Sequence, residues 1–82
     1  MINARQIRAA RALLGLSQGE LAALSKLGMA TVQRMEIAGD EVKGSALTIW
    51  KLQTALEEAG IVFIDRNSEF GFGVRLKDPS ER

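Results

Sequence analysis

The apolar positions in the first part of the chain recur at the spacing of amphipathic helices. The first predicted helix begins after Asn3, because Asn3 and Gln6 have the spacing of a capping box. It is predicted to end at Gly15, since glycine favours the C-terminal end of a helix. The apolar stripe expected on this helix consists of Ile7, Ala10, Leu13 and Leu14.

Two further helices follow at close spacing. Ser17 and Glu20 form a second capping box, which predicts that a helix of about two turns starts after Ser17. A third helix is predicted over about residues 29–38, with Val32 and Met35 facing inward and Gly39 as its C-terminal stop. The buried stripe expected on the second helix consists of Leu21, Ala22 and Leu24.

A fourth helix is predicted to start at Ser45 and to end before Gly60. Leu47 and Trp50 fall outside its main apolar face and form a second apolar strip. Since an exposed apolar patch is uncommon, we expect the chain's own C-terminal segment to cover this strip, with a partner subunit as the alternative. The main apolar face consists of Ile49, Leu52, Leu56 and Ala59.

The last third of the chain changes to the period of β-strands. "IVFI" at residues 61–64 is apolar on both faces, as in a central strand, although the chain offers only one further strand. Because a lone hairpin is marginal in water, we expect residues 61–77 to be a dimerisation element that meets its copy across a two-fold axis. Residues 78–82 are predicted to be a disordered tail. The second strand is predicted from the alternating residues Phe70, Phe72, Val74 and Leu76 after the loop "DRNSE".

Composition narrows the possible chemistry. The 82 residues include no cysteine and no histidine, which removes disulfides, thiol nucleophiles and the commonest metal ligand. No serine has a recognisable base, so we expect neither an enzyme nor a cofactor. No apolar run approaches the length of about 20 residues that a membrane span needs, and we expect a soluble, cytoplasmic protein.

The formal net charge of +1 is unevenly distributed. Residues 1–39 contain five Lys/Arg and two Asp/Glu, whereas residues 40–82 contain six and eight. The excess of basic residues in the first half suits a nucleic acid partner, and random surface charge would explain it equally well.

A short helix, a tight turn and a second helix make up the helix-turn-helix unit, whose second helix fits the DNA major groove. If Val32 and Met35 point into the core, a small set of side chains must project from the outer face of the third helix. That set consists of Met29, Ala30, Gln33 and Arg34.

The stretches "IRAARALLGLSQGELA" and "ATVQRME" resemble the Cro and phage-repressor class of helix-turn-helix proteins, the XRE-like transcriptional regulators. The resemblance covers about residues 4–59, and "KGSALTIWKLQTALEEAGIVFI" is similar to a subgroup that ends in a β-hairpin. It implies a mainly α fold: a four-helix, lambda-repressor-like domain over residues 1–60, followed by a two-stranded β-hairpin. It also implies sequence-specific binding of double-stranded DNA, usually as a homodimer.

The resemblance also assigns roles to single residues. Ser17 corresponds to the cap of the first motif helix, and Gln18 to a residue that approaches the DNA backbone or a base. Arg11 and Glu36 correspond to a pair that joins the first helix to the recognition helix. Ala22 corresponds to the small residue where the two motif helices cross. The base-reading and neighbouring positions correspond to Met29, Ala30, Thr31, Gln33 and Arg34, and the backbone-contacting loop to Lys43, Gly44 and Ser45.

Side-chain chemistry limits what each position can read. Gln33 can pair bidentately with adenine, Arg34 can bind guanine or a phosphate, and Met29 can only touch a thymine methyl group or pack. The sequence departs from the family where Lys26 replaces the turn glycine and Gly28 replaces the capping serine of the recognition helix. Because a residue with a Cβ resists positive φ, we expect the turn to shift so that Gly28 takes over the role of the glycine, with Lys26 contacting a phosphate.

The sequence thus predicts a transcriptional regulator, expected to be a repressor, that reads an inverted repeat with half-sites about 34 Å apart. The alternative is a protein-interaction module, antitoxin-like or an adaptor, that keeps the fold without specific DNA binding. Its support is the sparse outer face of the third helix, where Gly28, Met29 and Ala30 offer little polar chemistry. An RNA-binding role finds little support, since the chain has no tyrosine and no ladder of aromatic residues.

Overall fold

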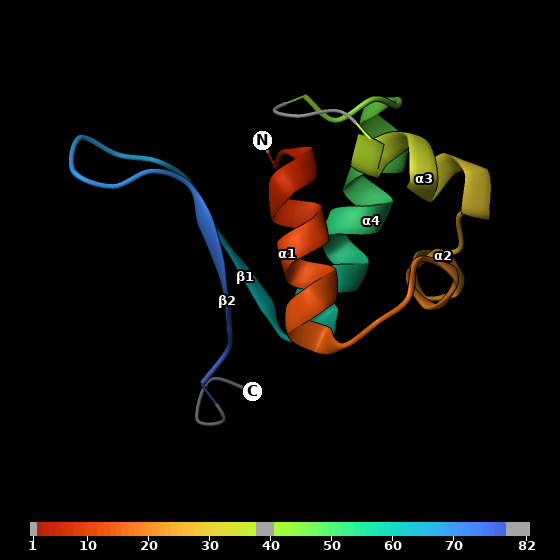
Figure 1. Cartoon of the computed structure of the whole chain (residues 1–82), viewed down its shortest axis with the longest axis horizontal. Coiled ribbons are helices and arrows are strands. Elements are labelled where there is room, and N and C mark those ends of the chain that lie inside the picture. The colour runs from red at the N-terminus through yellow and green to blue at the C-terminus, as the bar shows by residue number, and fades with distance from the viewer. Residues whose placement is uncertain (1, 38–40, 79–82) are drawn as a thin grey trace.

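The computed structural model describes residues 2–37 and 41–78, which form a mainly helical domain with a C-terminal antiparallel hairpin (Figure 1). The predicted mainly α class is thereby confirmed. Within this part of the chain, no helix is long and apolar enough to cross a membrane. The elements are α1 (Ala4–Leu14), α2 (Gln18–Ser25), α3 (Met29–Ile37), α4 (Ala46–Glu58), β1 (Ile61–Ile64) and β2 (Gly73–Leu76).

The helices begin where the capping residues predict. Asn3 Oδ1 accepts a hydrogen bond from the Gln6 N–H at 2.9 Å, and Gln6 Oε1 accepts one from the Asn3 N–H, also at 2.9 Å. Gly15 ends α1 in the left-handed conformation, with φ 69°. Ser17 caps α2 in the same reciprocal way as Asn3 caps α1. The predicted stop of the third helix at Gly39 lies outside the described residues.

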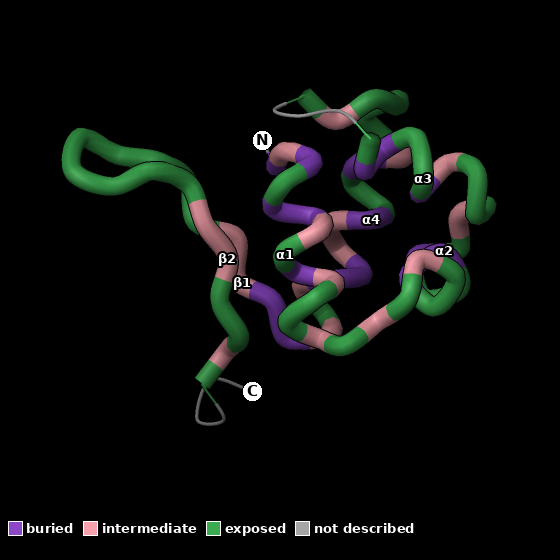
Figure 2. The backbone as a smooth tube through the Cα atoms, viewed as in Figure 1, coloured by how far each residue is buried: buried purple, intermediate pink, exposed green. Residues whose placement is uncertain are grey.

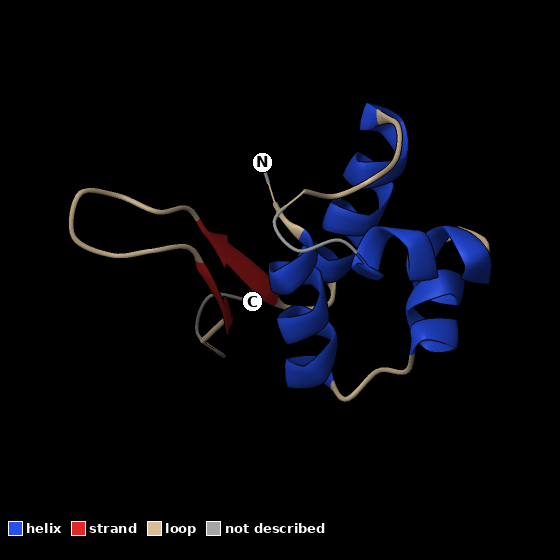
Figure 3. Cartoon of the chain, turned by 45° about the horizontal axis from the view of Figure 1, so that its top comes forward, coloured by secondary structure: helices blue, strands red, loops and turns tan. Residues whose placement is uncertain are grey.

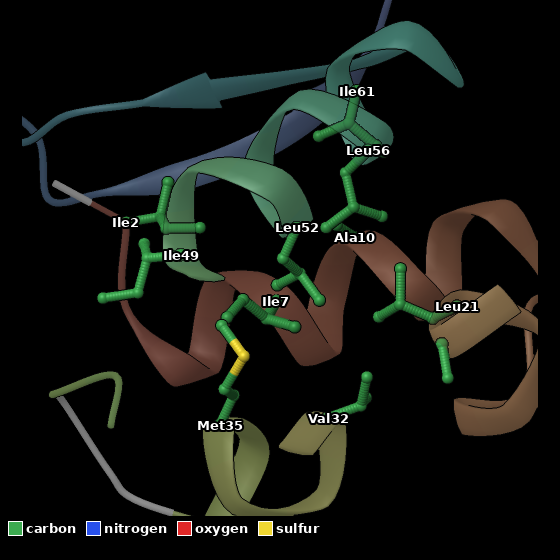
Figure 4. Packing of buried hydrophobic residues seen from close by; sticks show 11 residues of the cluster. Ile2, Ile7, Ala10, Leu21, Val32, Met35, Ile49, Leu52, Leu56 and Ile61 are labelled. Atoms are coloured by element: carbon green, nitrogen blue, oxygen red, sulfur yellow. The ribbon is translucent and has the colours of Figure 1, made fainter. Parts of the chain in front are cut away.

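The core lies where the four helices converge (Figure 4). Each large apolar side chain buried in this core contributes about 1.5–3 kcal/mol to the free energy of unfolding. Such contacts therefore dominate the stability of a domain this small. Ala59, predicted on the buried face of α4, is only half-buried, and Ala55 takes that place. The largest fully buried side chains are Ile7, Leu21, Val32, Met35, Leu52, Leu56 and Ile61.

Two leucines predicted in the core are exposed instead, Leu13 to 45% and Leu24 to 47%. Each lies about 100° around its helix from the centre of the buried stripe, so it sits at the edge of the stripe. The interior positions go to two polar residues, Gln6 in α1 and Ser25 in α2. Ser25 is satisfied within its own helix, because its hydroxyl donates to the Leu21 carbonyl at 2.7 Å.

The hairpin pairs Ile61 with Leu76 and Ile64 with Gly73 in antiparallel register. β2 is shorter than predicted: Phe70 and Phe72 belong to the exposed loop that joins the strands (Figure 2). Asn67 shapes this loop, since its Oδ1 accepts from the Glu69 and Phe70 N–H groups at 2.8 and 2.7 Å. The first strand is not buried on both faces either, because Ile64 is 38% exposed.

A buried glutamine joins the hairpin to α1. Gln6 Nε2 donates to the carbonyl oxygens of Ile64 and Gly73 at 3.1 and 3.0 Å. Since Gln6 Oε1 also accepts from the Asn3 N–H in the cap of α1, this one side chain bonds to both α1 and the hairpin. The hairpin stands beside α1 with its loop pointing away from the helices (Figure 3).

The prediction that the C-terminal segment covers Leu47 and Trp50 is wrong. Both side chains are 60% exposed. The hairpin turns toward α1 instead, because Phe63 and Val74 pack against the core and Gln6 holds the pair Ile64 and Gly73. Among residues 2–37 and 41–78, the apolar strip of α4 therefore stays uncovered.

Candidate nucleic-acid interface

A three-residue turn joins α2 to α3. Lys26 ends α2 in the left-handed conformation, with φ 58° and ψ 39°, and the Leu27 N–H donates to the Ala22 carbonyl at 2.9 Å. The expectation that Gly28 takes over this conformation is wrong, since Gly28 has no positive φ. The helix-ending bond of Leu27 requires the left-handed residue directly after Ser25, and that residue is Lys26.

Gly28 directly precedes α3 instead. Its carbonyl accepts hydrogen bonds from the N–H groups of Thr31 and Val32, both at 3.1 Å. A Cβ at this position would lie 3.9 Å from Thr31 Oγ1, which is an ordinary contact. Gly28 is exposed, so the start of α3 is open to the surroundings on this side.

α3 has one buried and one exposed face, as predicted. Val32 and Met35 are fully buried, whereas Gln33 and Arg34 are exposed between them. Arg34 Nη2 donates to Thr31 Oγ1 at 3.4 Å, which aligns two polar side chains along the helix surface. Met29 is 45% exposed and Ala30 is exposed, so all four predicted outward residues face away from the core.

A polar network fixes the orientation of α3. The Glu36 carboxylate accepts from Arg11 Nε and Nη2, each at 3.0 Å, although the Glu36 side chain is only 3% exposed. The predicted pair between the first and third helices is thereby confirmed. Arg8 adds a bond from Nη1 to the Glu36 backbone carbonyl, so α1 holds the end of α3 at two points.

Gln18 belongs to the same network. Its Nε2 donates to Glu36 Oε1 at 3.1 Å, which links the first turn of α2 to α3. The sequence pattern does not predict this bond between Gln18 and Glu36. The available signal was Glu36 itself, since a buried carboxylate needs several donors and one arginine rarely supplies them all.

The N-termini of α2 and α4 are exposed and capped by serine. Ser17 Oγ accepts from the Glu20 N–H at 3.0 Å, and Ser45 Oγ accepts from the Thr48 N–H at 3.1 Å. In both helices the N–H groups of the first two residues have no partner within the helix and can donate to an anion. The Ser17 N–H, which donates to the Glu20 carboxylate, lowers the pKa of Glu20.

Lys43 and Gly44 lead into α4. Lys43 is exposed, and Gly44 adopts φ 148°, a left-handed backbone conformation that favours glycine. This loop lies at the same end of the molecule as the end of α3 (Figure 1). Within residues 2–37 and 41–78, no group of three acidic side chains could hold a metal ion.

The predicted site residues thus fall into two groups. One group is continuous along the turn and the outer face of α3. There the exposed amide of Gln33 and the exposed guanidinium of Arg34 offer donors and acceptors suited to base edges or phosphates. The other group comprises the two helix starts, of which the α2 start is tied to α3 by the bond from Gln18 to Glu36. Comparison with protein-family models and with curated proteins finds no match for this chain.

Proposed function

We propose that this protein is a sequence-specific regulator of transcription that binds double-stranded DNA as a homodimer, with α2 and α3 as a helix-turn-helix. The observation that carries the proposal is the outer face of α3, where Gln33 and Arg34 are exposed while Val32 and Met35 anchor the helix. An α-helix with such a face fits the major groove, where glutamine can read adenine and arginine can read guanine.

The Glu36 network supports the same proposal. Groove binding requires a recognition helix whose side chains keep a fixed direction relative to the backbone contacts. Here Arg11 and Gln18 hold α3 against α1 and against the start of α2. The same bonds bring the free N–H groups of the α2 start into a fixed relation to Gln33, so one rigid unit offers phosphate and base contacts together.

Phosphate contacts are proposed at three places. The N-terminus of α2 and the N-terminus of α4 each offer free N–H groups and the positive end of a helix dipole. Lys43 precedes the second of these, and Lys26 stands in the turn before α3. Contacts of this kind supply binding energy for any sequence and position α3 over the bases.

The hairpin is proposed as the dimerisation element. Within the part of the chain that the structure describes, the two-stranded sheet leaves both outer strand edges without a strand partner. Ile64, Phe70 and Leu76 on or next to these strands are 38%, 68% and 41% exposed. A second copy that pairs across a two-fold axis would cover them and would set two recognition helices at about 34 Å, one turn of DNA.

Binding to duplex DNA of random sequence, measured over a range of salt concentrations, tests the proposal. The affinity should fall with salt, with a slope of about −0.9 for each phosphate neutralised. Lys43→Ala should lower the magnitude of that slope by about one. Lys77→Ala, at the far end of β2, is the matched control and should leave the slope unchanged. A folded protein with no measurable affinity at low salt would contradict the proposal and favour the protein-interaction module.

A further inference from the structure

A shallow groove of about 270 Å³ lies between the C-terminal end of α2 and the outer side of α4. Its apolar lining includes Leu24 and Trp50, which are 47% and 60% exposed. Trp50 belongs to the apolar strip of α4 that the hairpin leaves uncovered. Exposed apolar side chains gathered in a groove mark a binding surface more often than an isolated exposed leucine does.

Three charged side chains line this groove: Lys26 at the end of α2, and Lys51 and Glu58, which place opposite charges at its two ends along α4. Lys51 stands near Trp50, and Glu58 ends the helix two turns later, about 10 Å away along the axis. Both are exposed, and within the described residues neither takes part in an ion pair. Thr54, which is small and half-buried, lies halfway between them, whereas its neighbour Ala55 is buried in the core.

We propose that this groove binds a second copy of the chain, with the two α4 helices antiparallel across a two-fold axis between Thr54 and Ala55. In that arrangement Lys51 of each copy meets Glu58 of the other, so the contact contains two identical ion pairs. Thr54, beside the axis, is a small side chain at the contact and lets the helices approach closely. Each Trp50 then packs over the opposite helix and is removed from water.

Charge complementarity is the reason for choosing a second copy as the occupant. A surface with a positive and a negative end is self-complementary under a two-fold axis, which is the symmetry of most protein dimers. This contact is separate from the hairpin and does not rest on the proposed function. A chain with two such surfaces can form tetramers from two kinds of two-fold contact.

Trp50 is the only tryptophan of the chain, so its fluorescence reports on this groove alone. We expect its emission to shift to shorter wavelength as the protein concentration rises between about 1 µM and 1 mM, the range of weak self-association. Sedimentation of the same samples should show the corresponding increase in mass. Both measurements use the full chain without DNA.

Charge reversal then identifies the contact. Lys51→Glu and Glu58→Lys should each weaken the concentration-dependent shift about tenfold or more, because each creates two like-charged pairs. The double variant Lys51→Glu/Glu58→Lys should restore it. Neither residue has a charged neighbour three or four positions away in α4, so the variants should keep the helix, which circular dichroism checks.

Ile37→Ala is the matched control, since Ile37 is 80% exposed but lies on α3 outside the groove. It should leave the shift unchanged. The proposal is overturned if Trp50 emission does not depend on concentration, or if the double reversal remains as weak as either single variant. A hairpin dimer would still appear in sedimentation in that case, which separates the two contacts.

Discussion

Replacement of Lys26 with glycine should stabilise the chain, because Lys26 ends α2 in the left-handed conformation with φ 58° and ψ 39°. For a residue with a Cβ this conformation costs about 1–2 kcal/mol. Glycine avoids the cost, but its greater freedom in the unfolded chain offsets about 0.4–1 kcal/mol. The net gain in the free energy of unfolding should therefore be about 0.5–1 kcal/mol.

Thermal and urea unfolding followed by circular dichroism measure this gain. For a domain of this size 1 kcal/mol corresponds to about 4–8 °C, so Lys26→Gly should raise Tm by about 2–8 °C. Lys26→Ala removes the same charge but keeps the Cβ, and it should stay close to the wild type. If the glycine variant is no more stable than the alanine variant, the left-handed turn carries no cost and the reasoning is refuted. Both variants should weaken DNA binding equally, since both lose the proposed phosphate contact.

Three further substitutions test the contacts that hold the fold, and a fourth, Gln53→Ala, serves as a control. Gln6→Ala should lower the free energy of unfolding by about 2–3 kcal/mol, since one of the two bonds of the α1 capping box and two bonds to the hairpin are lost together. Gln53→Ala, in α4, should change it little. Glu36→Gln should cost about 2–4 kcal/mol in urea unfolding, because it removes the ion partner of Arg11, and a loss under 1 kcal/mol would contradict the role of the network. The lowered pKa of Glu20 contributes stability that is present above its ordinary value of 4.5 and is lost as the pH falls through the lowered value. Glu20→Gln keeps the capping bond and should remove this part of the acid sensitivity, which unfolding at a series of pH values measures.

The helix starts could be predicted because they depend on neighbours in the sequence. Asn3 and Ser17 each need only the residue three positions later to form a capping box, and both boxes are present. The inward direction of Val32 and Met35 also follows from local spacing, and it correctly places Gln33 and Arg34 outside.

The remaining features depend on contacts between distant segments. Gln6 looks like a capping residue in the sequence, and only the docked hairpin, 58 positions away at Ile64, shows its second use. Leu24 is apolar and close to the stripe of α2, but the direction in which α4 packs leaves it at the edge. Its exposure could not be predicted from helical period alone.

The candidate site also combines features set by local sequence with features set by contacts between elements. Lys26 departs from local preference because the cost of about 1 kcal/mol is smaller than the energy of packing two helices at a fixed angle. Gln18 was assigned to DNA by resemblance, and its bond to Glu36 appears only when α2 and α3 are placed together. Among the internal supports of this surface, the pair Arg11 and Glu36 is indicated by the resemblance, whereas the bond of Gln18 to Glu36 could not be predicted from the sequence.

Selection of binding sites from a pool of random duplex DNA tests the central claim most directly. It should be carried out at about 150 mM salt, where non-specific phosphate contacts are weak. The proposed function predicts an enriched inverted repeat with half-site centres about 10 base pairs apart, and loss of preference at one position of each half-site for Gln33→Ala. If the folded wild type enriches no sequence, α3 does not read DNA and the proposed function is contradicted.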